Sequence, residues 1–267
     1  LDRGVLVGDG AMGSLLAQAL GPSQKCVEEA NLSHPDVVLD IHLKYISAGA
    51  DIIETNTFGA TSGRPREFGL EARVEEVNSR AVKIARDARE ISGKDVVIAA
   101  SMGPAAPAFD LVTRESRDLA RRRYQQQAEI LEQRGVEAFI IETFPSVRDL
   151  RVAVEAVRTV SSLPIIAQLT FPGGEPEELD LAAIARAFAE AADLPIEVLG
   201  VNCGTGPRET LTILENVPSS LGCHVSVYPN AGVPVRSRGR YFYPDSSPGY
   251  FAAFAQEAVR LGARIVG

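Results

Sequence analysis

Cys203 is the side chain in this sequence whose chemistry most needs an explanation. It follows the apolar run Val198–Val201 and Asn202, and two glycines and a proline come soon after it. A thiol there can pack as a small hydrophobic group, react as a nucleophile or bind a metal. A catalytic zinc site needs about three protein ligands, and no Cys-x-x-Cys or His-x-x-Glu-His pattern supplies the others. The residues alone therefore leave these roles open.

Polar residues also follow other apolar runs. Glycines around Ala11 and Met12 let backbone N–H groups converge on an anion, and Asp9 or Glu142 suits a substrate ammonium group. Asp9-Gly10 is also a common turn sequence, and Glu142 is equally suited to a helix N-terminus. Asn56 and Asn230 could bind a ligand or close their own loops. The polar strand ends are Gly8-Asp9-Gly10-Ala11-Met12-Gly13, Glu54-Thr55-Asn56-Thr57-Phe58, Ser101-Met102-Gly103, Glu142-Thr143-Phe144, Asn202-Cys203-Gly204 and Tyr228-Pro229-Asn230.

The elements that must position these residues are eight short apolar runs. They are rich in Val, Ile and Leu and lack a polar alternation, which is typical of strands buried on both faces of a parallel sheet. Helical patterns separate them, so the sequence predicts an α/β chain folded as a (β/α)8 TIM barrel, a single domain over residues 1–267. The active site of such a barrel lies at the carboxyl ends of its strands. The runs are Val5–Val7, Asp51–Glu54, Val96–Ala100, Ala138–Ile141, Ile165–Leu169, Val198–Val201, His224–Val227 and Arg264–Val266.

Two segments depart from a regular barrel. Residues 236–241 predict an exposed insertion before the last strand. A closed barrel also has a helix after strand 8, but the sequence stops at Gly267. We therefore expect a barrel domain whose C-terminus is truncated or incompletely ordered.

Composition excludes several classes of function. The net charge of −8 and pI near 5.1 disfavour binding to nucleic acid or to a membrane surface. No apolar run approaches the roughly 20 residues that span a bilayer, and no secretion signal opens the sequence. Three scattered cysteines suit a reduced, cytoplasmic protein, and we expect Cys26 and Cys223 to be bystanders.

Taken together, the strand-end motifs resemble those of the homocysteine S-methyltransferase family. Asp9-Gly10-Ala11-Met12-Gly13, Glu54-Thr55-Asn56-Thr57-Phe58, Glu142-Thr143-Phe144, Gly200-Val201-Asn202-Cys203 and Pro229-Asn230-Ala231-Gly232 occur in the family's order. The sequence resembles, equally, the homocysteine domain of cobalamin-dependent methionine synthases and that of bifunctional proteins that carry a methylenetetrahydrofolate reductase.

The resemblance implies methyl transfer to the thiolate of homocysteine, giving methionine, at a zinc ion bound by three cysteines. One cysteine would be Cys203, and an adjacent pair would follow Gly267, which matches the first glycine of a Gly-Gly-Cys-Cys motif. Asp9 and Glu142 would bind the substrate amine, and the backbone around Ala11 and Met12 its carboxylate. Asn56 and Asn230 complete the predicted substrate-binding set; Asn230 matches a position near the metal.

The methyl donor that we expect is methyltetrahydrofolate acting through methylcobalamin, supplied by a fused or partner folate, cobalamin or reductase domain. Betaine or S-methylmethionine is the alternative donor. Two other functions stay open at this point. The chain could be a metal-free, inactive barrel that supports a fused reductase or cobalamin domain. It could also be an unrelated barrel lyase or hydrolase with Glu142 as its base.

Overall fold

The structure is a computed structural model. It describes residues 4–21, 26–62, 71–105, 111, 113–171, 176–218, 221–232, 235–237, 240–242 and 247–267. Eight parallel strands form one sheet in the order β1-β10-β7-β6-β5-β4-β3-β2. The strands are β1 (Leu6–Val7), β2 (Ile52–Glu54), β3 (Val97–Met102), β4 (Ala138–Phe144), β5 (Ile165–Leu169), β6 (Val198–Asn202), β7 (His224–Tyr228) and β10 (Ala263–Val266).

The sheet closes into a barrel where β1, at one end of the strand order, meets β2, at the other end. Gly8, just after β1, bridges to Ile52 of β2 in parallel. The Asp51 N–H donates to the Val7 carbonyl (2.7 Å), and the Asp9 N–H donates to the Ile52 carbonyl (2.9 Å). Each predicted apolar run overlaps one of the eight strands, so the predicted (β/α)8 barrel is confirmed.

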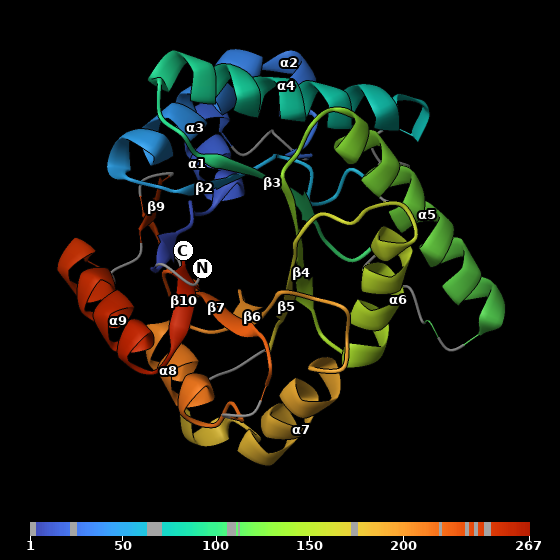
Figure 1. Cartoon of the computed structure of the whole chain (residues 1–267). Helices are drawn as coiled ribbons and strands as arrows, with labels where there is room; N and C mark the ends of the chain where they lie inside the picture. The colour runs from blue at the N-terminus through green and yellow to red at the C-terminus, as the bar shows by residue number, and fades with distance from the viewer. Residues whose placement is uncertain are drawn as a thin grey trace.

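Helices connect the strands and surround the sheet (Figure 1). They are α1 (Met12–Leu20), α2 (Ala30–Ser33), α3 (Pro35–Ala48), α4 (Val74–Ser92), α5 (Arg114–Gln133), α6 (Val147–Arg158), α7 (Leu181–Ala191), α8 (Pro207–Glu215) and α9 (Pro248–Arg260), with 3₁₀ turns at Glu71–Arg73 and Pro176–Glu178. The N-caps of α5, α6, α7 and α9 each accept a hydrogen bond from the third helical residue. Local sequence thus sets where these helices begin. Among the described helices, none combines the length and apolar character needed to cross a membrane.

The core of the described residues has three parts. One cluster consists of strand residues and fills the inside of the barrel, and the largest joins the outer faces of the strands to the helices. The third packs α1, α2, α3 and α4 together. Gly200 keeps the interior narrow, since a Cβ there would lie 2.0 Å from Ser226 Oγ. Ser226 Oγ instead accepts a hydrogen bond from Gln168 Nε2 (3.1 Å). Side chains therefore fill the barrel along its axis, and a ligand can bind only at the rim formed by the carboxyl ends of the strands.

The two departures predicted from the sequence have different outcomes. In the region predicted as an insertion, Val235–Ser237 (β8) pairs antiparallel with Arg240–Phe242 (β9), so it contains a short hairpin rather than a loop alone. At the other departure, Gly267 directly follows β10 and is the last residue described. Val7 of neighbouring β1 is 47% exposed.

Candidate active site

Three carboxyl side chains converge at the carboxyl ends of the strands. Asp9 follows β1, Glu54 ends β2 and Glu142 lies near the end of β4. Asp9 Oδ2 accepts a hydrogen bond from the Glu54 N–H (2.9 Å), and the side chains of Glu54 and Glu142 are hydrogen-bonded to each other. Within the described part of the chain, no Lys, Arg or His forms an ion pair with any of the three. The barrel mouth, where these strand ends meet, thus holds an acidic cluster without a cationic partner.

The cluster holds protons more tightly than isolated carboxyl groups do. Burial raises the pKa of Asp9 well above its usual value, and the charge of Glu142 adds to the rise. Burial also raises the pKa of Glu54, with further contributions from Glu142 and Asp9. Burial raises the pKa of Glu142 as well, although hydrogen bonds from Ser101 and Glu54 oppose this. A ligand that brings a positive charge would relieve the repulsion among these groups.

Glu142 is held on both of its oxygens. Ser101 Oγ, from the end of β3, donates to Oε1 (2.5 Å), and Asn202 Nδ2, from the end of β6, donates to Oε2 (2.9 Å). Asn202 also hydrogen-bonds the neighbouring Thr143. The carboxyl group therefore has a fixed orientation before any ligand binds.

Two strand ends at this rim carry non-glycine residues with left-handed backbone. Thr143 has φ 64° and Cys203 has φ 55°, a conformation that costs roughly 1–2 kcal/mol for a residue with a Cβ. The Cys203 N–H donates to the Tyr228 carbonyl (2.9 Å), and its own carbonyl accepts from the Thr205 N–H (2.7 Å). These bonds hold the half-buried thiol at the rim. Strain of this kind is concentrated at functional sites.

The other two cysteines lie elsewhere. Cys26 Sγ hydrogen-bonds Glu28 Oε2 (3.3 Å), and burial raises its pKa to about 11. Cys223 directly precedes β7, at the end of the barrel opposite the carboxyl cluster, and burial raises its pKa too. Burial thus disfavours the thiolate form of both side chains.

The remaining predicted residues occupy different places. Ala11 is the N-cap of α1 and Met12 begins it, so the N-terminus of that helix lies at the rim close to Asp9. Asn230 is exposed just after β7, and its N–H donates to the Thr205 carbonyl (2.9 Å). Asn56 is buried, and its Nδ2 donates to the Val27 carbonyl (2.9 Å) and to Asn31 Oδ1 (3.0 Å). The contact of Asn56 with the substrate stays a prediction. The side-chain N–H groups that would make it already donate to Val27 and Asn31.

The site residues predicted from the sequence did not include Glu54 or Tyr228, although both lie at the barrel mouth. Glu54 stands at the end of a predicted strand, a signal that could have placed it in the site. Tyr228 lies beside the carboxyl groups, whose charges add to the burial that raises its pKa. Its hydroxyl is buried without a hydrogen-bond partner among the described residues.

The ring of Tyr228 fits only because glycines flank it. A Cβ on Gly8 would lie 2.1 Å from Tyr228 Oη, and one on Gly267 would lie 2.1 Å from Cε1. We expect Gly8→Ala to lower the free energy of unfolding by about 1–3 kcal/mol, because the added methyl group overpacks the mouth. Urea denaturation of Gly8→Ala beside Gly4→Ala measures this, since a Cβ on Gly4 meets nothing within 4 Å. Equal stability of the two variants would contradict the prediction.

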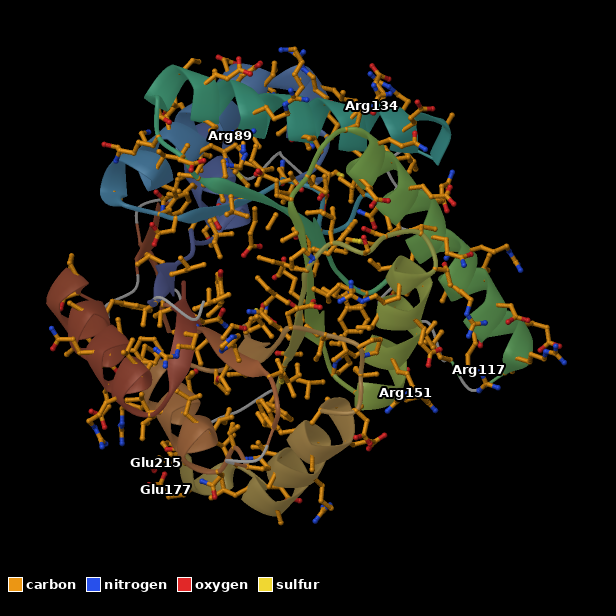
Figure 2. All side chains as sticks on the ribbon, in the orientation of Figure 1. Arg89, Arg117, Arg134, Arg151, Glu177 and Glu215 are labelled. Atoms are coloured by element: carbon orange, nitrogen blue, oxygen red, sulfur yellow. The ribbon has the colours of Figure 1, made fainter. Side chains whose placement is uncertain are left out.

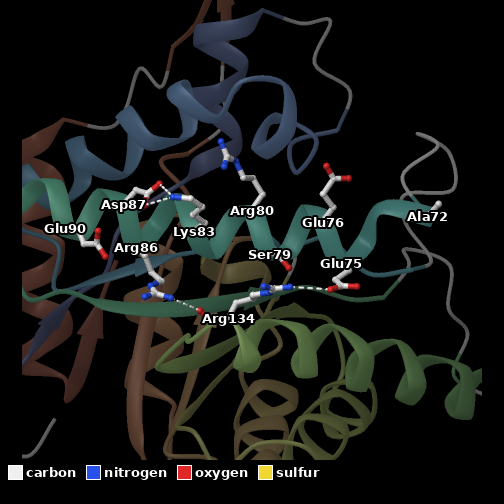
Figure 3. Close-up of a pocket in the computed structure, with 10 residues that line it drawn as sticks. All are labelled: Ala72, Glu75, Glu76, Ser79, Arg80, Lys83, Arg86, Asp87, Glu90 and Arg134. Carbon is white, nitrogen blue, oxygen red and sulfur yellow. Dashed lines mark hydrogen bonds and ion pairs between the residues drawn. The ribbon is translucent and has the colours of Figure 1, made fainter.

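Charged residues elsewhere lie on the outside of the barrel. Arg117, Arg151, Glu177 and Glu215 are at its periphery (Figure 2). A surface hollow of about 850 Å³ lies along α4, next to Arg134. Figure 3 shows the residues that line it. Four acidic and four basic side chains line it, and two ion pairs among them join Lys83 to Asp87 (2.7 Å) and Arg134 to Glu75 (3.3 Å). The hollow offers no unbalanced charge, so the barrel mouth is the stronger candidate.

Comparison with protein families matches residues 6–267 to the family described as homocysteine S-methyltransferase. The chain belongs to this family. The match confirms the resemblance drawn from the strand-end motifs, and it places the chain among the methyltransferases.

Similar proteins agree with the family. The chain is 31% identical to the methionine synthase of Mycobacterium leprae and 29% identical to that of Mycobacterium tuberculosis. Each alignment covers the whole chain but only 23% of the relative, so the chain spans about a quarter of these methionine synthases. The crystal structure of the metallated homocysteine methyltransferase MmuM from Escherichia coli has the same fold, with TM-score 0.77 and 22% identity over 98% of this chain and 90% of that one.

Proposed function

We propose that this barrel transfers a methyl group to the thiolate of homocysteine and so forms methionine. The observation that carries the proposal is the unbalanced acidic cluster, which lies on the same rim as a thiol and the N-terminus of α1. Homocysteine carries an ammonium group, a carboxylate and a thiol, and each has a complementary group here. An unrelated lyase or hydrolase would not need the thiol.

The acidic cluster is the proposed amine site. Asp9 and Glu142 bind the ammonium group as charge-assisted acceptors, and its positive charge offsets the burial that raises the pKa of both groups. The first N–H groups of α1, around Ala11 and Met12, bind the carboxylate, because a helix N-terminus carries unpaired donors and partial positive charge. The substrate is thereby oriented with its sulfur free to reach the rim. Asn56 and Asn230 are the other proposed contacts.

Zinc is the proposed metal, and Cys203 fits one position in its ligand set. Over the described residues, no group of three His, Cys, Asp or Glu side chains could hold a metal ion, so Cys203 is the ligand that this part of the chain offers. Cys203 and Gly267 lie on opposite sides of β7. The Cys203 N–H donates to the Tyr228 carbonyl of β7, and the Gly267 N–H donates to the Val227 carbonyl (3.0 Å). Two cysteines following Gly267 would emerge beside Cys203. Bound zinc would lower the pKa of the substrate thiol and leave a nucleophilic sulfur.

The proposed donor is methyltetrahydrofolate acting through methylcobalamin, bound by a fused or partner domain. Support comes from the relatives, which are named methionine synthases and are about four times as long as this chain. Betaine and S-methylmethionine are the competing donors.

The cytoplasm is the proposed compartment, where thiols stay reduced. Methionine formation by the full-length protein, measured with each donor in turn, tests the function; no product from any donor would favour the inactive module.

The amine site gives a sharper prediction. Asp9→Asn keeps the shape of the side chain and an acceptor for the Glu54 N–H, but it removes one charge from the cluster. We expect kcat/KM for homocysteine to fall by about 10- to 100-fold, the range of one charge-assisted hydrogen bond. We also expect the melting temperature to rise, because less repulsion is buried. Enzyme kinetics with thermal melting check both, and a loss of activity together with a loss of stability would contradict this role.

A further inference from the structure

Asn202 joins two strand ends that are not neighbours in the sheet. It ends β6, directly before Cys203, and is 5% exposed. Its Oδ1 accepts from the Thr143 N–H (2.8 Å), and its Nδ2 donates to Thr143 Oγ1 (2.8 Å) and to Glu142 Oε2 (2.9 Å). Because β5 lies between β4 and β6, this amide reaches across the end of β5.

The contact fixes the backbone of Thr143 as well as its side chain. Thr143 has φ 64°, and Asn202 binds both its N–H and its hydroxyl. Left-handed backbone in a residue with a Cβ persists only where its surroundings hold it. Cys203, the next residue after Asn202, is left-handed too. One amide thus links two strained strand ends.

The same amide fixes the carboxyl group of Glu142. Ser101 holds Oε1 from β3, and Asn202 holds Oε2 from β6. Without Asn202, Glu142 would lose the donor on Oε2 and would keep its hydrogen bonds with Ser101 and Glu54, so its orientation would be less tightly fixed. Cys203 is joined to Asn202 by a single peptide link, which sets their Cα atoms about 3.8 Å apart. Few freely rotating bonds therefore separate the thiol from the carboxylate.

We propose that Asn202 is a positioning residue that fixes the distance between the Cys203 thiol and the Glu142 carboxylate. The inference rests on the proposed function, in which Glu142 binds the substrate amine and Cys203 lies near the substrate sulfur. A fixed separation selects amino thiols whose nitrogen and sulfur match it, so homocysteine is preferred to cysteine, which is one methylene shorter. Misplacement of a bound group by about 1 Å can cost 100-fold in rate.

The test compares two substrates in the full-length enzyme. Homocysteine carries the amine, and 4-mercaptobutanoate has the same chain without it. In Asn202→Ala we expect kcat/KM for homocysteine to fall about 10- to 100-fold, mainly through KM. We expect the value for 4-mercaptobutanoate to change less than threefold, and the preference for homocysteine over cysteine to shrink. Asn216→Ala is the matched control, because that amide donates to the Thr212 carbonyl (2.9 Å) at the end of α8 and should change neither substrate.

A second variant separates positioning from folding. Thr143→Gly removes the penalty of the left-handed backbone, so adding it to Asn202→Ala should restore the melting temperature without restoring selectivity for homocysteine. Selectivity that returns with stability would overturn the proposal. So would equal losses for both substrates, with or without loss of zinc, or no loss for either. If the wild-type enzyme makes no methionine, the proposed function fails instead, a result independent of Asn202.

Discussion

Cys203→Ser is expected to remove zinc from the protein and to lower methyl transfer to homocysteine by more than about 100-fold. The variant is made in a chain that continues beyond Gly267 and includes the two proposed cysteines. Serine has nearly the same shape, but its hydroxyl does not ionise near neutral pH and is a harder ligand than a thiolate. Without the metal, the substrate thiol stays mostly protonated and is a poor nucleophile. Metal analysis and a methionine assay on the same sample measure both effects.

The two other cysteines are the matched controls. Cys26→Ser and Cys223→Ser change the same atom in thiols whose pKa is raised by burial. Both variants should keep full zinc content and activity. Zinc retained at full stoichiometry in Cys203→Ser would refute the proposed ligand. Zinc lost equally from all three variants would point instead to a general loss of structure.

The strands of this barrel could be predicted because their own residues determine them. A run such as Ile165–Leu169 is buried on both faces, and an unbroken apolar run is the local sign of that environment. Helix limits are equally local: Pro35 is a start signal and Gly49 a stop signal in the sequence, and α3 runs from Pro35 to Ala48 with Gly49 at φ 110°.

The site could be predicted only in outline. Barrel geometry placed the strand ends on one rim, but contacts across it depend on the stagger and tilt of the strands. The reach of Asn202 over β5 and the hydrogen bond between Glu54 and Glu142 arise from that stagger, so no local pattern shows them. Asn56 shows the converse, because a polar residue at a strand end can serve the scaffold instead of the mouth.

Loss of stability in mild acid is the second large effect that we expect, and His42 is its cause. His42 lies on α3 with its neighbours Val38, Ile41 and Ile46 also buried; its side chain is fully buried, and neither ring nitrogen has a hydrogen-bond partner among the described residues. Burial lowers its pKa from 6.5 to about 4. Below pH 6.5 the unfolded chain therefore binds a proton that the folded chain refuses, and stability falls as pH falls.

The expected loss is about 2 kcal/mol between pH 7.5 and 5, and about 3 kcal/mol by pH 4. The carboxyl cluster acts in the opposite direction, because raised pKa values in the folded state add stability as pH falls. Comparing wild type with His42→Phe cancels that contribution, since both proteins keep the cluster. Phenylalanine changes packing by an amount that does not depend on pH, so urea denaturation across this range isolates the histidine. A difference between the two proteins that stays constant from pH 7.5 to 5 would show that His42 is not the acid-sensitive group.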